Sequence, residues 1–342
     1  MKQNKALREK MQEHLDNLTK PVGSLGKLEA FALRMSEIQG KVPPSVTKKA
    51  VYVIAADHGV NKAGVSMFPS EVTEQMVLNF TAGGAGINVL ARHCGFDLIA
   101  VDAGVAADID HPDVVAMKAG YGTANFAETE AMTEEQLFSC IENGKKLAAD
   151  AVAAGYELVA LGDMGISNTS SAAAMAVAAG LDAELIIDKG TGISDEILDK
   201  KRQVIMSAVE KHAPYKDAMD VMRKLGGFEL CTMAGFILGL KGSGTACMID
   251  GFPVTSGAYM AFKHDPQVAG YLFAGHKSRV KGHKPMLDEM GLEAIVDFDM
   301  RLGEGTGAVI GGFMVELGVK IAAEMASFAS AGVTAAENEE AY

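Results

Sequence analysis

The stretch AVYVIAA at residues 50–56 is a continuous apolar run that ends at Asp57, His58 and Gly59. Apolar runs of this length are typical of strands that are buried on both faces of a parallel sheet. Similar runs recur along the chain, and helical segments lie between most of them. Strands that alternate with helices indicate βαβ units. The further predicted strands are residues 98–101, 158–161, 246–249, 271–274 and 294–300.

This alternation predicts an α/β fold of the Rossmann-like type. We expect a parallel sheet of about six strands with helices on both faces. Helical periodicity at residues 2–20 and 24–39, and a long apolar helix from about 307 to 328, lie outside the alternation. The sequence therefore predicts an α/β domain of residues 49–306. It predicts a small helical subdomain made of residues 1–48 together with 307–342.

Composition limits the partners. The 342 residues carry a formal net charge of −13, which argues against nucleic acid or an anionic membrane as a partner. The first twenty residues contain no apolar signal segment, and no eighteen-residue run is free of polar residues. We therefore expect a cytoplasmic protein with no membrane span. The cysteines lack metal spacing and are expected to be reduced thiols: Cys94, Cys140, Cys231 and Cys247.

The segment RLGEGTGA at residues 301–308 places Glu304 between Gly303 and Gly305. It follows the predicted strand 294–300, which we expect to be central, and precedes the long helix. Ligands bind at the carboxyl ends of parallel strands, so Glu304 is a candidate general base with a raised pKa. The alternative is a glycine-rich turn with a solvated glutamate. A dinucleotide fingerprint is disfavoured because the turn lies near the C-terminus and carries the wrong charge.

The segment GDMGISNTSS at residues 162–171 follows a predicted strand and opens an alanine-rich helix. Free backbone N–H groups at a helix start, with hydroxyls beside them, form an anion site. No lysine occupies the P-loop position, so a monophosphate fits better than a triphosphate. The alternative is ordinary N-capping by Asn168 or Thr169.

The glycine-containing segment 189–192 is predicted to be a flexible turn, and the predicted helix Asp195–His212 follows it. This helix brings Lys200 and Lys201, either of which could meet a phosphate. For each lysine, the alternative is a solvated side chain.

Two further sets of residues leave alternatives open. The segment 66–69 and a helix carrying Val72, Gln75 and Met76 could form the wall of an aromatic pocket, or could be plain core. A metal-dependent phosphohydrolase is the minority hypothesis, because its candidate ligands could equally cap helices or hold loops. Those candidate ligands are Asp57, His58, Asp102 and His276.

Six segments together resemble one family, the nicotinate-nucleotide:dimethylbenzimidazole phosphoribosyltransferases of cobalamin lower-ligand synthesis. They span nearly the whole chain. The segments are KPVGSLGKL (20–28), ADHGV (56–60), GDMGISNTSSAAA (162–174), GGFE (226–229), DGF (250–252) and RLGEGTGA (301–308).

The resemblance implies transfer of phosphoribose from nicotinate mononucleotide to a benzimidazole nitrogen, giving an α-ribotide and nicotinate. It implies a parallel α/β sheet with a small helical domain, acting as a homodimer without metal or other cofactor. The implied acceptor is a benzimidazole, a purine or a phenol. A non-catalytic protein that binds nicotinate mononucleotide is a further alternative.

The resemblance also assigns roles. Glu304 matches the catalytic base. Asp163 lies where relatives often carry glutamate, and its side chain is one methylene shorter, which limits how far it reaches toward the acceptor. Phe68, Met76 and Gln75 are assigned to the acceptor pocket. Phe68 and Met76 lie where some relatives place polar residues, so a more apolar pocket would affect which acceptor base binds. The phosphate and ribose would contact Gly165, Ile166, Ser167, Asn168, Thr169, Ser170, Lys201, Ser278, Gly303 and Gly305.

Overall fold

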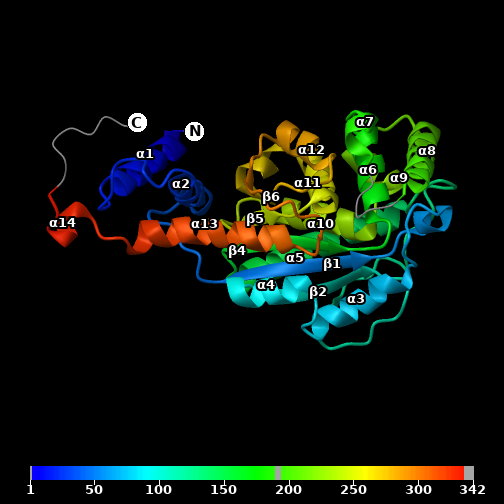
Figure 1. Cartoon of the computed structure of the whole chain (residues 1–342), viewed down its shortest axis with the longest axis horizontal. Coiled ribbons are helices and arrows are strands. Elements are labelled where there is room, and N and C mark those ends of the chain that lie inside the picture. Colours follow the sequence, from blue (N-terminus) through cyan, green and yellow to red (C-terminus); the bar gives the residue numbers. More distant parts are fainter. Residues whose placement is uncertain (1, 189–193, 335–342) are drawn as a thin grey trace.

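The computed structural model describes residues 2–188 and 194–334. The predicted turn at 189–192 and the last residues of the predicted subdomain, 335–342, lie outside the described residues. Figure 1 shows the arrangement of helices and strands along the chain.

A seven-stranded sheet forms the centre of the protein, in the order β3-β2-β1-β4-β5-β6-β7. Every pairing is parallel, which confirms the predicted α/β class. The seventh strand, β3, was missed because three residues carry no readable periodicity. The strands are β1 Lys49–Ala56, β2 Asp97–Gly104, β3 Val114–Ala116, β4 Leu158–Met164, β5 Ala246–Ile249, β6 Leu272–His276 and β7 Ala294–Val296.

Strand β1 explains why its sequence is apolar throughout. All eight residues are buried, and they alternate between two cores. Tyr52 and Ile54 face one core, whereas Val51 and Val53 face the other. The chain order reverses between β1 and β4, which is the switch point where such sheets bind ligands.

Helices cover both faces of the sheet (Figure 1). Helices α4 and α13 belong to one layer, and α5, α10 and α11 belong to the opposite one. The helices are α1 Lys2–Asp16, α2 Lys27–Gln39, α3 Glu71–Thr81, α4 Gly86–Cys94, α5 Glu134–Ala153, α6 Asn168–Ala178, α7 Ala183–Ile186, α8 Asp195–His212, α9 Ala218–Leu225, α10 Phe228–Gly239, α11 Phe252–His264, α12 His283–Met290, α13 Thr306–Glu324 and α14 Phe328–Ala331, with 3-10 turns η1 Gly59–Ala63 and η2 Pro266–Tyr271.

Helix α13 links the sheet to the N-terminal helices. Its first half packs on the sheet, and its second half packs with α1 and α2 around Met11, Leu15, Leu33 and Ala322. Helix α13 is long and apolar enough to cross a membrane, but 61% of its apolar window is buried inside the protein, as in a core helix. The division into two domains stays a prediction.

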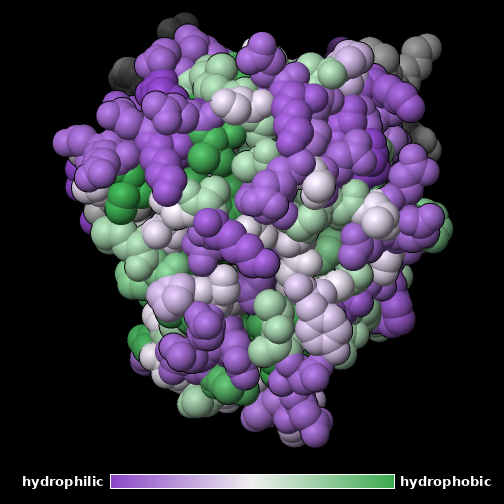
Figure 2. All heavy atoms as spheres, turned by 90° about the vertical axis from the view of Figure 1, so that its right-hand side faces the viewer, coloured by the Kyte–Doolittle hydropathy of each residue, from purple (hydrophilic) through white to green (hydrophobic). Residues whose placement is uncertain are grey.

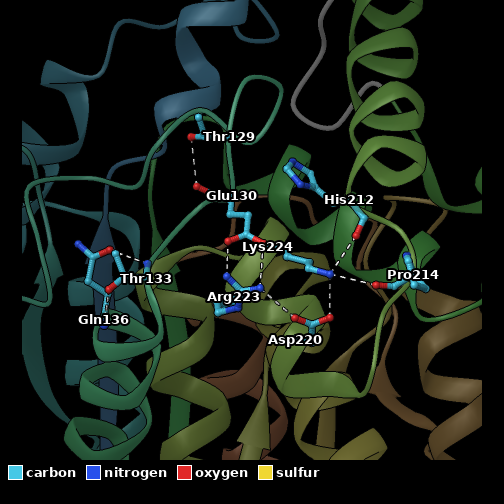
Figure 3. A network of polar contacts seen from close by, with 9 residues as sticks. All are labelled: Thr129, Glu130, Thr133, Gln136, His212, Pro214, Asp220, Arg223 and Lys224. Atoms are coloured by element: carbon cyan, nitrogen blue, oxygen red, sulfur yellow. Dashed lines mark hydrogen bonds and ion pairs between the residues drawn. The ribbon is translucent and has the colours of Figure 1, made fainter.

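A polar network ties α9 to the segment before α5 (Figure 3). Arg223 donates to Glu130 at 2.8 Å and to Asp220 at 3.1 Å. Lys224 donates to the carbonyl oxygens of His212 and Pro214, both at 3.0 Å. The network therefore joins α9 and the nearby residues 212–214 to Glu130, which lies 93 residues before Arg223 in the sequence.

Candidate functional site

A cavity of about 400 Å³ lies at the carboxyl ends of the strands. Figure 2 looks onto this side of the molecule, where hydrophobic side chains lie among hydrophilic ones. The lining comes from segments that follow β1, β4, β5, β6 and β7. A larger hollow of about 610 Å³ beside α12 and β7 lacks the strand-end carboxylates Asp163 and Glu304, so we place the candidate site in the smaller cavity.

Glu304 reaches this cavity by a route that the sequence did not predict. The strand before it, β7, is three residues long and lies at the edge of the sheet, so the prediction of a central strand was wrong. The following segment crosses back to the centre, where the Glu304 backbone lies directly against Gly162 of β4. A Cβ atom at Gly162 would collide with that backbone. The glycine therefore permits the approach of Glu304 to the switch point.

The turn around Glu304 has an unusual backbone. Gly303, Glu304 and Gly305 have φ values of 86°, 63° and 88°, all left-handed. For a residue with a side chain this conformation is uncommon, and it persists where surrounding contacts impose it. The structure thus fixes the direction in which the Glu304 side chain leaves the turn.

Asp250 supplies those contacts. Its Oδ2 accepts a hydrogen bond from the Gly305 amide at 3.0 Å. Its Oδ1 accepts from the amides of Gly307 at 2.8 Å and Ala308 at 3.0 Å, so Asp250 caps the start of α13. Sequence reasoning gave Asp250 no role. The available signal was an aspartate that ends the apolar run 246–249, as Asp57 ends the run 50–56.

The environment of Glu304 suits a base. The residue is 6% exposed and lines the cavity. Burial is the main effect that raises its pKa, and the charge of Asp250 adds to it. A hydrogen bond from the Ile87 amide to Oε2, at 3.2 Å, acts in the opposite direction. The raised pKa agrees with the expectation from the sequence and makes the carboxylate more basic than an exposed one.

Asp163 also lines the cavity but has a different environment. Its Oδ2 accepts a hydrogen bond from Asn168, and its buried Oδ1 has no partner in the described part of the chain. Burial, followed by the charges of Asp250 and Glu229, raises its pKa well above the usual value. These effects favour the neutral acid, so Asp163 is a weaker candidate for a base than Glu304.

The turn between β4 and α6 forms a further part of the cavity wall. Residues 165–169 line the cavity, and α6 begins at Asn168. Its N-cap residue is Ser167, with φ 75° and no side-chain capping bond, so ordinary capping by Asn168 or Thr169 is not what the structure shows. Several donors of this turn already bond within the protein: the Ile166 amide to Thr73 Oγ1, the Asn168 amide to the Gly165 carbonyl oxygen and the Thr169 amide to Asn168 Oδ1. An anion bound at this helix start would exchange for some of these bonds.

Lys201 is the cation at this turn. Its side chain is buried, lines the cavity and donates to Thr169 Oγ1 at 2.8 Å. Burial lowers its pKa to about 8. Lys200 is exposed and does not line the cavity, so the structure separates two lysines that the sequence left as alternatives.

The remaining candidates divide between the cavity and its surroundings. Ser278, Gly303, Phe68 and Met76 line it. Ser170 is fully buried behind the turn, and the Gly305 amide is engaged by Asp250, so neither lines the cavity. Gln75 is on the exposed side of α3, outside the lining, so its assignment to the pocket does not agree with the structure.

The four candidate metal ligands do not converge. Asp102 pairs with Lys118 at 2.8 Å, and His58 bonds to Glu229 at 2.7 Å. In residues 2–188 and 194–334, no group of three or more His, Cys, Asp or Glu side chains could hold a metal ion. Their hydrogen bonds match the alternative in which these side chains hold loops. The set consists of Asp57, His58, Asp102 and His276.

Comparisons with known proteins identify the family of this chain. A family model described as phosphoribosyltransferase matches residues 1–333. The nicotinate-nucleotide–dimethylbenzimidazole phosphoribosyltransferase of Geobacter sulfurreducens is 48% identical over 94% of this chain and 92% of its own length. The enzyme of that name from Chloroflexus aggregans is 46% identical over 93% of this chain and 91% of its own.

A solved structure shares the fold. The crystal structure of CobT from Thermus thermophilus superposes with a TM-score of 0.92 at 42% identity, covering 96% of this chain and 99% of that one. The chain therefore belongs to the nicotinate-nucleotide–dimethylbenzimidazole phosphoribosyltransferase family.

Proposed function

We propose that this protein transfers phosphoribose from nicotinate mononucleotide to 5,6-dimethylbenzimidazole or an analogous base, yielding the α-ribotide and nicotinate for the cobamide nucleotide loop. The names of the relatives support the two substrates. One observation carries the proposal: a carboxylate of raised pKa, the turn before α6 and a buried lysine line the same cavity.

The reaction can be followed atom by atom. A lone pair of the acceptor nitrogen forms a bond to C1′ of the ribose, on the face opposite the leaving group. The bond from C1′ to the pyridinium nitrogen breaks, and its electron pair neutralises that nitrogen, so nicotinate departs. The acceptor ring gives up its N–H proton to Glu304. Because nicotinate leaves from a cationic ring, the leaving group needs no proton from the protein.

The residues contribute in different ways. Glu304 is the proposed base, and a general base contributes ~10²–10⁴-fold in rate. Residues 165–169 and Lys201 hold the 5′-phosphate through amides, hydroxyls and one ammonium group. Phe68 and Met76 lie against the flat acceptor ring. Holding both rings in one cavity supplies orientation, which is a large part of the acceleration in a two-substrate transfer.

The proposed function includes a range of acceptor bases and a homodimeric state. The resemblance supports a benzimidazole, purine or phenol as acceptor, and a cytoplasmic homodimer as the active species. Light scattering on the purified protein tests the dimer, and a mass near 36 kDa would contradict it because one chain weighs 35.9 kDa.

The decisive experiment is incubation of the purified protein with nicotinate mononucleotide and a panel of acceptors, followed by mass spectrometry. Formation of one ribotide for each nicotinate released supports the transfer. Release of phosphate, or release of nicotinate at the same rate without acceptor, would support a hydrolase instead. Binding of nicotinate mononucleotide without any product would support the non-catalytic alternative.

A further inference from the structure

Asn61 connects two parts of the cavity wall. One is the phosphate turn, residues 165–169, and the other is the acceptor wall, residues 66–70 together with Met76 of α3. Asn61 lies in η1, directly after β1, and its side chain bonds in two directions. Its Oδ1 accepts a hydrogen bond from Ser167 Oγ at 2.9 Å, in the phosphate turn. Its Nδ2 donates to Ser70 Oγ at 3.0 Å and to the Phe68 carbonyl oxygen at 3.4 Å, in the segment that forms the acceptor wall.

A second connection between the phosphate turn and the acceptor wall is buried in the protein. The Ile166 amide of the phosphate turn donates to Thr73 Oγ1 at 3.1 Å. Thr73 is fully buried on α3, the helix that also carries Met76 of the acceptor wall. Adjacent residues of the phosphate turn, Ile166 and Ser167, are thus each tied to the acceptor wall.

Neither connecting residue lines the cavity. Asn61 and Thr73 are absent from its lining, whereas Ile166, Ser167 and Phe68 are part of it. Asn61 and Thr73 would therefore act through their neighbours, as positioning residues. Ser167 has a left-handed backbone with φ 75°, a conformation that depends on surrounding contacts.

The acceptor wall is the more exposed side of the cavity. Met67 and Phe68 are 54% and 50% exposed, although both line the cavity. The phosphate turn, in contrast, is anchored by β4 and by the start of α6. A phosphate that fixes Ile166 and Ser167 would consequently restrict the wall through Asn61 and Thr73.

We propose that Asn61 and Thr73 couple the two half-sites, so that an occupied phosphate turn positions the acceptor wall and strengthens acceptor binding. This inference rests on the proposed function, because it takes residues 165–169 as the phosphate site. The first ligand already restricts the wall, so the second loses less conformational freedom on binding. Coupling of this kind is reciprocal: the acceptor must strengthen phosphate binding by the same factor.

Calorimetry on the full-length protein tests the coupling. The dissociation constant of 5,6-dimethylbenzimidazole is measured alone and with saturating ribose 5-phosphate, which has the sugar and phosphate but no leaving base. The wild-type protein should bind the acceptor at least about fivefold tighter in the presence of the sugar phosphate, the lower end of typical coupling. Ribose 5-phosphate should gain the same factor from saturating acceptor.

The substitution Asn61→Ala should reduce this factor towards one, with each ligand's separate affinity changed by less than about threefold. Ser70→Ala removes only one contact on the acceptor side, so it should give an intermediate factor and serves if Asn61→Ala folds poorly. Asn143→Ala is the matched control, since that asparagine is also half-buried and bonds the Met117 carbonyl oxygen outside the cavity.

The outcomes separate the two claims. Equal coupling in the wild-type, Asn61→Ala and Asn143→Ala proteins would overturn the inference alone. Absence of coupling in the wild-type protein, with both ligands bound, would also overturn it alone. Failure of ribose 5-phosphate or 5,6-dimethylbenzimidazole to bind at all would overturn the proposed function and the inference together.

Discussion

Oε2 of Glu304 accepts a hydrogen bond from the amide of Ile87, at 3.2 Å. Ile87 lies in the first turn of α4, where unpaired N–H groups and the helix dipole favour negative charge. The bond fixes one carboxylate oxygen and leaves the group as a whole on the cavity wall. An acceptor ring that enters the cavity would therefore meet a base whose position is set by α4 and by the turn before α13.

Asp250 should control the basicity of Glu304. Asp250→Asn removes a negative charge that raises the pKa of Glu304, so the acid limb of the kcat/KM profile should move to lower pH. The variant should also lower kcat, because the turn loses an acceptor for its amides. A pH–rate series for the two proteins measures both effects, and an unmoved acid limb would show that Asp250 acts only in folding.

Asp250→Asn should also lower the free energy of unfolding by about 1–3 kcal/mol, the usual cost of a buried amide left without a partner. Chemical denaturation measures this change in the free energy of unfolding independently of activity. A stable variant with wild-type kcat would contradict the positioning of Glu304 by Asp250.

Lys201 should make nicotinate mononucleotide binding sensitive to pH. Its pKa is lowered to about 8 by burial, and a bound phosphate favours the charged ammonium. Above pH 8 the free protein carries the neutral amine and must take up a proton to bind. The KM for nicotinate mononucleotide should therefore rise as pH increases above about 8, approaching tenfold per pH unit.

Lys201→Ala should raise that KM at pH 7 far more than the KM for the acceptor, and should abolish its rise above pH 8. Lys200→Ala is the matched control, because Lys200 is exposed and outside the cavity. Equal effects of Lys201→Ala on the two KM values would count against a phosphate contact.

Phe68 and Met76 should set the acceptor preference. Replacing them by polar residues, as in Phe68→Ser and Met76→Gln, should shift preference among benzimidazoles, purines and phenols, since hydrogen-bonding groups would then face the ring. Competition between acceptors, read by mass spectrometry, gives the ratio of kcat/KM values. Gln75→Ala on the same helix is the control, and an order unchanged in all three variants would remove Phe68 and Met76 from the pocket.

Arg223 should contribute to stability without affecting catalysis. Arg223→Ala breaks the contacts to Glu130 and Asp220 shown in Figure 3, at a cost of roughly 1 kcal/mol because these groups are partly exposed. Arg223 is the main cause of the lowered pKa of Glu130. That stabilisation is present above the unfolded pKa of Glu130, near 4.5, and is lost as pH falls through the lower folded value.

Denaturation at several pH values should therefore show the Arg223→Ala deficit at pH 7 and a smaller deficit once the pH has fallen through the lowered pKa of Glu130 in the folded protein. Both proteins should have the same kcat. A loss of turnover in Arg223→Ala would mean that the network also supports the site.

The sheet could be predicted because its signal is local. A strand buried on both faces must be apolar throughout, and residues 50–56 satisfy this without reference to the rest of the chain. The order of the strands could not be predicted, since pairing joins residues far apart in the sequence. This is why β7 was expected at the centre although it lies at the edge.

The site was predictable where one short segment builds it. The turn at 165–169 and the Gly-flanked Glu304 are contiguous motifs, and both line the cavity. Asp250 was not identified because its role depends on amides 55 to 58 residues further along the chain. Gln75 was misplaced because neighbouring residues on a helix point about 100° apart, so Met76 can face the cavity while Gln75 faces solvent.

The proposal that Glu304 is the base is tested most directly by the turnover of Glu304→Gln. The amide keeps the size and hydrogen-bonding capacity of the side chain but cannot take a proton from the acceptor. Glu142→Gln, exposed on α5, is the control for loss of one carboxylate. Because the Asp163 carboxyl also lines the cavity and can take over part of the proton transfer when it is ionised, the double variant with Asp163→Asn should lose more activity than either single one.

The measurement is the single-turnover rate at saturating nicotinate mononucleotide and 5,6-dimethylbenzimidazole, with folding and binding of both substrates verified beforehand. We predict that Glu304→Gln binds both substrates and reacts ~10²–10⁴-fold more slowly than the wild-type protein, nearer the lower value. A Glu304→Gln rate equal to the wild-type rate, with chemistry limiting, would contradict the assignment of Glu304 as the base.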